Sequence, residues 1–196
     1  MQALDAVMRV ILASKSLALM HTHAASSPSG MGARLVGINF LAASNEKESL
    51  RYASFITNPQ TRKVGQIAAD GRVTLSFADS DAEDYAVLHA TASVVHDEAL
   101  RAQVWQSRFP PGSPQEDFAK NAFPGGPAGV NFLPISLTVT EIELIAHDLP
   151  DRSNAVADHP AGWKPLVLTW SPSGWIVKPD DGRVIVQSQT TAGDGD

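Results

Sequence analysis

The 196-residue sequence contains no cysteine, which excludes disulfides, thiolate nucleophiles and cysteine-ligated zinc or iron–sulfur sites. It also lacks an excess of basic residues, because the net charge is −6 and the pI is near 5.4. A general nucleic-acid binder needs a strong basic field and is therefore not expected. What remains is an ordinary globular composition, 43% hydrophobic and 18% charged, in a chain long enough for one domain with a substantial core.

The one segment that needs checking as a targeting or membrane-spanning sequence is residues 7–20. Arg9 and Lys15 interrupt its apolar character, and no cationic segment precedes it. It is also too short to span a bilayer. We therefore expect a core helix followed by a strand, a cytoplasmic protein, and no membrane partner. The sequence also lacks Walker, Gly-x-Ser-x-Gly and dinucleotide-binding fingerprints.

Apolar periodicity and turn residues predict many short strands with a few helices between them. The predicted helices are residues 4–14, a helix from Pro59 to Asp70, and a helix capped by Asp97 that ends at Trp105. The predicted strands are residues 17–24, 33–41, 52–56, 72–77, 85–95 and 131–145, then a hairpin over 163–177 and a short strand at 183–187. This order favours a mainly β (β+α) fold, a barrel that carries peripheral helices.

Three other stretches are predicted to be irregular. The acidic residues 79–84 lack the glycine and the terminal glutamate of a calcium-binding loop, so we expect a solvated turn. Residues 108–130 are rich in proline and glycine and predict a long loop. Residues 148–162 predict a polar linker, and residues 191–196 a frayed tail.

The residues after the 52–56 strand are the most informative about function. Asn58 is predicted to cap the helix and Pro59 to be its first residue, which places Arg62 and Lys63 in the first turns. The free N–H groups and the macrodipole already make the potential positive there, so two cations are unfavourable unless an anion joins them. A phosphate would satisfy the backbone amides, the Thr61 hydroxyl and both cations. The alternative is a capped surface helix whose charges face water.

The Phe-Ile-Thr-Asn-x-x-Thr-Arg-Lys arrangement of residues 55–63 resembles the FMN-phosphate segment of the pyridoxamine 5′-phosphate oxidase-like split barrels. The similarity is specific over about residues 52–97 and is strongest to the general stress protein 26 branch. It implies a split β-barrel of about six to eight mostly antiparallel strands, and a homodimer with FMN at its interface. Residues 1–150 would form the FMN-binding domain and residues 151–190 a C-terminal hairpin extension of it.

The resemblance also implies which residues hold the cofactor. Arg62 and Lys63 would bind the phosphate, and Thr61 would donate its hydroxyl to it. Arg34 resembles an arginine that also reaches the phosphate, whereas without the resemblance it would be a solvated strand-end residue. The remaining residues placed at the flavin are Leu35, Val36, Gly37, Ile56, Thr57 and Asn58. Val36 and Gly37 would lie along the ring, and Ile56 and Thr57 would touch the ring or the ribityl chain.

The chain also departs from the oxidase pattern. Tyr85-Ala86 stands where the oxidases have an Arg-Gln pair that contacts the flavin, and their C-terminal substrate-binding segment has no counterpart. Pyridoxal phosphate synthesis is therefore not expected. Three functions stay open. The first is an FMN-dependent oxidoreductase of unknown substrate, with no catalytic side chain assigned, and the second is a non-catalytic protein that binds flavin or F420 on the same fold. The third is a scaffold whose dimer surface is its function.

No metal site is predicted from the histidines. His21 and His23 lie two residues apart and face one side of a strand, but two imidazoles are too few to specify a metal site. His89 and His96 are predicted to be ordinary strand and turn residues.

Overall fold

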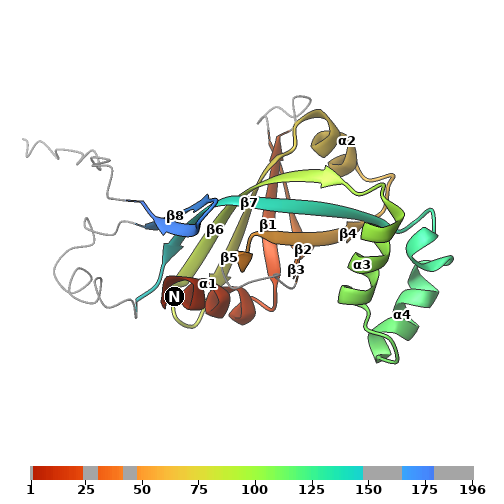
Figure 1. Cartoon of the computed structure of the whole chain (residues 1–196), viewed down its shortest axis with the longest axis horizontal. Coiled ribbons are helices and arrows are strands. Elements are labelled where there is room, and N and C mark those ends of the chain that lie inside the picture. Colours follow the sequence, from red (N-terminus) through yellow and green to blue (C-terminus); the bar gives the residue numbers. More distant parts are fainter. Residues whose placement is uncertain (1, 24–30, 42–47, 148–164, 179–196) are drawn as a thin grey trace, which may run out of the picture.

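The strands pair antiparallel and form one curved sheet (Figure 1). The computed structural model describes residues 2–23, 31–41, 48–147 and 165–178. The strands are β1 (Leu17–His23), β2 (Met31–Gly37), β3 (Asn39–Phe40), β4 (Tyr52–Thr57), β5 (Arg72–Asp79), β6 (Asp84–Val94), β7 (Leu133–Ile145), β8 (Leu166–Ser171) and β9 (Gly174–Val177). The helices are α1 (Gln2–Ala13), α2 (Arg62–Ala69), α3 (Glu98–Arg108), α4 (Pro114–Ala122) and the short 3₁₀ helix η2 (Gly126–Ala128).

The strand order shows why the sheet curls into a barrel. It runs β2-β1-β5-β6-β7-β4-β3. Only Ile38 separates β2 from β3, so one continuous segment stands at both ends of this order. Its first part pairs with β1, where Leu35 lies opposite Leu19, and its last part pairs with β4, where Asn39 lies opposite Ser54. The predicted split barrel with peripheral helices is confirmed.

The core lies inside this curl and at the end covered by α1. Val7, Val10 and Ile11 of α1 are buried against the sheet interior, as the apolar spacing of residues 4–14 predicts. Burying three such side chains contributes several kcal/mol to folding, at about 1.5–3 kcal/mol each. Within the described residues, no helix is long and apolar enough to cross a membrane.

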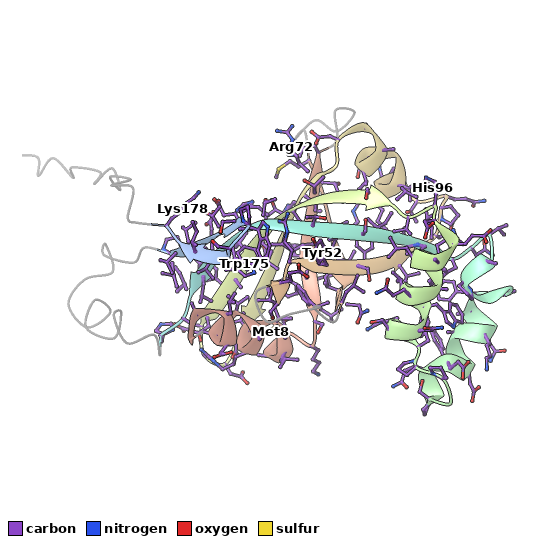
Figure 2. The ribbon with its side chains drawn as sticks, viewed as in Figure 1. Met8, Tyr52, Arg72, His96, Trp175 and Lys178 are labelled. Carbon is purple, nitrogen blue, oxygen red and sulfur yellow. The ribbon has the colours of Figure 1, made fainter. Side chains whose placement is uncertain are left out.

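The C-terminal hairpin β8–β9 extends the sheet, because β8 pairs with β7. The Trp175 indole N–H donates to the Ser49 carbonyl at 2.7 Å and thereby fastens the hairpin to the segment before β4. Trp175 and Lys178 lie at the end of the molecule opposite His96 (Figure 2). The hairpin predicted over 163–177 is confirmed where the structure describes it. The predicted 183–187 strand, the 148–162 linker and the 191–196 tail lie outside the described residues.

Residues 108–130 do not form the predicted long loop. The helix α3 runs to Arg108, and α4 begins directly after Ser113, whose hydroxyl accepts a hydrogen bond from the Glu116 N–H at 3.3 Å. Pro114 occupies the first turn of α4, where its missing N–H costs nothing. The prediction was wrong because a Ser-Pro pair suits a helix start as well as a turn. A second apolar cluster joins these helices through Val104, Trp105, Phe109, Ala119 and Phe132.

The acidic segment is also not entirely a solvated turn. Asp79 is half-buried and accepts a hydrogen bond from the Asp81 N–H. In contrast, Asp84 is 2% exposed. Arg9 donates to one of its carboxylate oxygens at 2.8 Å, and the other lies 2.7 Å from the His147 ring nitrogen and accepts from the His147 N–H at 3.0 Å. Asp84 therefore links α1 to the end of β7.

The substitution Asp84→Asn is expected to lower the free energy of unfolding at pH 7 by about 1.5–3 kcal/mol, the range for hydrogen bonds to a charged group. Burial alone would raise the pKa of Asp84, but its bonds to His147 and Arg9 hold that pKa below its ordinary value. A lowered folded-state pKa means that the stabilisation is present above the ordinary aspartate pKa and is lost as the pH falls through the folded-state pKa.

Urea unfolding at pH 7 and pH 3 tests this prediction. The wild type should lose more stability between the two pH values than Asp84→Asn does. Asp81→Asn, in the exposed turn, is the control and should behave as the wild type. An equal loss of stability in wild type and Asp84→Asn would show that Asp84 does not carry the acid sensitivity.

Candidate functional site

The turn between β4 and α2 sets the start of the helix. The Thr61 N–H donates to the Asn58 carbonyl at 3.1 Å, and the Asn58 side chain accepts from the Gln60 N–H at 2.8 Å. The N-cap of α2 is Thr61, so the predicted Asn58 cap is wrong. The reason is that the fixed φ of Pro59 suits the second position of a turn as well as a helix start. The helix therefore begins at Arg62.

Two threonine hydroxyls lie next to this helix start. Thr57, at the end of β4, is 6% exposed, and its Oγ1 is 3.1 Å from the Thr61 Oγ1. The Thr61 hydroxyl donates to the Asn58 carbonyl at 2.9 Å. It makes no capping bond to the N–H groups of α2. Those first N–H groups are thus not satisfied by the cap side chain, which is the condition for an anion to bind there.

Arg34, on β2, contacts α2 through the side chain of Gln66. One of its terminal nitrogens donates to the Gln66 side-chain oxygen at 2.7 Å and, more weakly, to the Thr22 hydroxyl at 3.5 Å. Thr22 in turn donates to the same Gln66 oxygen at 2.8 Å. Arg34 is therefore not a solvated strand-end residue. Its Nε atom is buried and has no hydrogen-bond partner in the described part of the chain.

The sequence interpretation missed Thr22 and Gln66, although each carries a weak signal. Thr22 follows Ala18 and Met20 at alternate positions of β1, so a strand pattern places it on the core face. Gln66 lies one helical turn after Arg62. Neither pattern identifies Arg34 as the partner, because β2 and α2 are distant in the sequence.

Three cations, Arg34, Arg62 and Lys63, gather at the start of α2. Burial lowers the pKa of Arg34, and the charge of Arg62 lowers it further. Burial likewise lowers the pKa of Lys63, and the charge of Arg34 adds to the effect. Across the residues that the structure describes, none of the three forms an ion pair. An anion at this point would relieve the repulsion and would satisfy the helix N–H groups at the same time.

The other predicted site residues are less closely gathered. Leu35 points away from the barrel and is 70% exposed, whereas Val36 is buried in the core. Gly37 is half-buried, and Ile56 packs against the cluster around Trp105. The structure thus brings together Arg34, Thr57, Thr61, Arg62 and Lys63. It does not bring Leu35, Val36, Gly37 and Ile56 onto one surface of a single chain.

Comparison with known proteins agrees with the likeness that residues 55–63 indicate. A family model described as "Pyridoxamine 5'-phosphate oxidase like" matches residues 42–114. A Clostridium acetobutylicum protein related to general stress protein 26 of Bacillus subtilis is 16% identical, with a TM-score of 0.57 over 74% of this chain and 89% of that one. The resemblance to this family is thereby confirmed over residues 42–114, and the general stress protein 26-related structure shares the fold.

Two further structures cover a larger share of this chain. A pyridoxamine 5′-phosphate oxidase-related, FMN binding protein from Nostoc punctiforme is 13% identical, with a TM-score of 0.59 over 89% of this chain and 94% of that one. PhzG from Burkholderia lata, in complex with tetrahydrophenazine-1-carboxylic acid, is 13% identical, with a TM-score of 0.56 over 90% and 89%. Likeness at these identities establishes the fold. A search of curated proteins found no match.

Proposed function

We propose that this chain, which has the fold of the pyridoxamine 5′-phosphate oxidase-like proteins, binds FMN and acts as a flavin-dependent oxidoreductase. The observation that carries the proposal is the group of three cations at the start of α2 without a carboxylate partner in the described residues. FMN differs from riboflavin by one phosphate, a dianion that matches this charge. The Nostoc punctiforme relative, an FMN binding protein, supports the same cofactor.

The residues present fit a phosphate. The Nε of Arg34, which has no partner in the described residues, offers a donor, and the hydroxyls of Thr57 and Thr61 lie beside the helix N–H groups and would rotate toward a bound phosphate. Arg62 and Lys63 supply the remaining charge at the first two positions of α2. Bound FMN would supply hydride transfer, while these residues would anchor and orient it. No side chain is assigned as a catalytic acid or base.

The ring end of the cofactor requires a second surface, which we propose is a second copy of this chain. Leu17 and Leu19 of β1 and Leu35 of β2 are exposed on the outer face of these two strands. Leu19 lies directly opposite Leu35 in the β1–β2 ladder, so the side chains form one apolar patch. The segment after Arg34 would then lie between the phosphate site and the partner, as a flavin at a dimer interface requires.

A second candidate is a protein that binds flavin or F420 on this fold without turnover. The observation that favours it lies at the start of β6, where the oxidase-like pattern has a flavin-contacting glutamine. Here Ala86 occupies that position and is completely buried, so it offers no polar group to a flavin ring. This difference concerns reactivity at the ring and does not affect the phosphate site.

An absorbance spectrum of the purified protein, followed by titration with FMN, FAD, F420 and riboflavin, tests the proposal. We expect FMN to bind at least tenfold more tightly than riboflavin, since charge-assisted bonds to phosphate are worth about 1.5–3 kcal/mol each. A colourless protein without saturable FMN binding would overturn it. Reduction of the bound flavin by a nicotinamide donor at catalytic rates would separate the oxidoreductase from the non-catalytic candidate.

The substitution Gly32→Ala is expected to weaken FMN binding about tenfold without unfolding the protein, the loss of about one charged hydrogen bond. A Cβ at position 32 would lie 2.4 Å from the Arg34 terminal nitrogen and 3.1 Å from the Gln66 oxygen. The side chain of Arg34 is flexible, so it would move aside and leave the site. Gly65→Ala on α2 is the matched control, because a Cβ there meets nothing within 4 Å. Equal FMN affinity in both variants would contradict a role for Arg34.

A further inference from the structure

The outer face of the sheet carries a second group of polar side chains, separate from the cations at α2. His89 of β6 lies opposite Glu141 of β7, and Glu143 follows two residues later on the same face of that strand. One ligand atom from each of the three lies within 4.8 Å of the others. We propose that His89, Glu141 and Glu143 form a binding site for a divalent first-row transition metal ion such as Zn²⁺.

The distances are close to those that a metal requires. The Nε2 atom of His89 lies 3.0 Å from a carboxylate oxygen of Glu143. Zinc bonds to nitrogen and oxygen are about 2.0–2.1 Å long, so two neighbouring ligands of a tetrahedral ion are about 3.3 Å apart. This pair therefore needs almost no movement to share an ion. A carboxylate oxygen of Glu141 lies within 4.8 Å of these two ligand atoms, so a rotation of its side chain would bring it to the ion.

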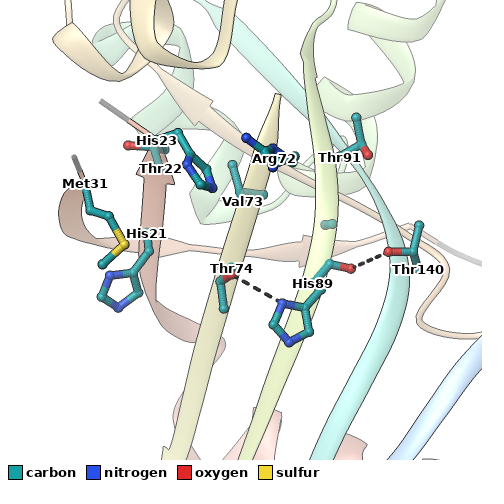
Figure 3. A pocket seen from close by; sticks show the side chains of 11 residues that line it. His21, Thr22, His23, Met31, Arg72, Val73, Thr74, His89, Thr91 and Thr140 are labelled. Carbon is teal, nitrogen blue, oxygen red and sulfur yellow. Dashed lines mark hydrogen bonds between the residues drawn. The ribbon is translucent and has the colours of Figure 1, made fainter. Parts of the chain in front are cut away.

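The imidazole of His89 is oriented for ligation. Its Nδ1 lies 3.4 Å from the Thr74 hydroxyl on β5 (Figure 3). The other ring nitrogen, Nε2, is therefore the one that faces Glu143. A ligating histidine commonly donates its other N–H to an oxygen in this way, which fixes the tautomer. The Thr140 hydroxyl donates a hydrogen bond to the His89 carbonyl at 3.2 Å. The ladder shifts register directly after His89, and such irregularities redirect side chains at functional sites.

Charge also favours a cation here. Glu141 and Glu143 are both partly buried, with side chains 25% and 29% exposed. The ammonium of Lys178, just after β9, forms an ion pair with Glu141 and occupies one side of the group. A metal ion would compete with Lys178 for that carboxylate. One imidazole with two carboxylates suits Zn²⁺, Mn²⁺ or Fe²⁺ better than Ca²⁺, which takes six to eight oxygen ligands.

One member of the group, His89, also lines a pocket, whereas neither glutamate does. His89, Thr74 and Thr140 line a pocket of about 290 Å³, together with His21, His23 and Arg72. Figure 3 shows His21 of β1 and His89 of β6 on either side of Thr74. Three protein ligands leave at least one coordination position open, as in zinc sites that bind water or substrate. The site is therefore expected to hold an exchangeable ligand.

Calorimetric titration of tag-free, flavin-free protein with ZnCl₂ tests the proposal. We expect one ion per chain, and at least a tenfold loss of affinity in His89→Ala and in Glu143→Gln. Thr74→Val should weaken binding about tenfold while keeping one site, because it removes only the orienting hydroxyl. Lys178→Met should bind zinc more tightly than wild type, since it removes the competing cation. Circular dichroism of each variant checks that the fold is kept.

His96→Gln, an exposed histidine beyond the end of β6, is the matched control and should bind as the wild type. Arg62→Ala should also leave zinc binding unchanged, which separates this site from the proposed phosphate site. The proposal is overturned if the wild type does not bind zinc at micromolar concentration. It is also overturned if His89→Ala keeps full affinity while a His21→Gln, His23→Gln double variant loses it.

Discussion

Lys63→Ala and Arg62→Ala are each expected to weaken FMN binding by about 1.5–3 kcal/mol, the range for a hydrogen bond to a charged group. That energy corresponds to roughly a 10- to 150-fold rise in Kd. Arg62 and Lys63 are the first two residues of α2. A phosphate there would also be attracted by the helix N–H groups and the macrodipole. Flavin fluorescence quenching, with riboflavin as the ligand that lacks the phosphate, measures the effect. Riboflavin affinity should change little in either variant.

The stability of the ligand-free variants gives an independent check. Burial lowers the pKa of Lys63 and the charge of Arg34 lowers it further, so the cations repel one another before a ligand binds. Removing one of them should leave the free energy of unfolding unchanged or slightly higher. An ordinary surface ion pair would show a small loss instead. Lower FMN affinity with an unchanged free energy of unfolding therefore distinguishes a phosphate-binding role for these cations from a structural ion pair.

Arg72→Ala is the matched control for these variants. Arg72 is exposed and already pairs with Asp70 through a hydrogen bond of 2.6 Å. It also lies beyond the C-terminal end of α2, where the helix dipole does not favour an anion. FMN affinity should therefore be unchanged in Arg72→Ala. Unchanged affinity in both Arg62→Ala and Lys63→Ala would mean that the phosphate binds elsewhere.

The arrangement of strands could be predicted because its signals are local. The alternation of buried and exposed residues along β5 and β6 places Val73, Leu75 and Phe77 on one face, and the acidic turn joins the two strands. Asp97 before α3 is a cap that the sequence alone identifies, and its side chain accepts from the Leu100 N–H at 2.8 Å. These features depend on neighbours within a few positions.

The features that the sequence could not predict depend on residues far apart in the chain. Asp84 meets Arg9 and His147, which lie 75 and 63 positions away, so its burial has no local signal. Gln66 meets Arg34 across 32 positions. The start of α2 was predicted wrongly for a local reason: Asn58 can cap a helix or close a turn, and Pro59 suits either. The sequence thus predicts which residues belong to the candidate site, but not which side chains they contact.

If the chain forms the proposed homodimer through the apolar patch on β1 and β2, Leu35→Glu is expected to yield a monomer and to lower FMN affinity at the same time. Leu35 is the most exposed member of the apolar patch on β1 and β2, and in a two-fold dimer each copy would bury the same residue. An unpaired carboxylate buried in an interface costs about 3–5 kcal/mol, which would raise the dimer dissociation constant roughly hundredfold or more. The charge is on the outer face, so the barrel core is unaffected.

Light scattering coupled to size exclusion gives the oligomeric state, and the FMN titration gives the affinity of the same sample. Ile176→Glu is the control, because Ile176 is an exposed apolar residue of β9, away from the patch. It should leave both measurements unchanged. If Leu35→Glu stays dimeric, the partner uses another surface. If it becomes monomeric but binds FMN as tightly as wild type, a single chain completes the flavin site, and the three cations at α2 suffice to hold the cofactor.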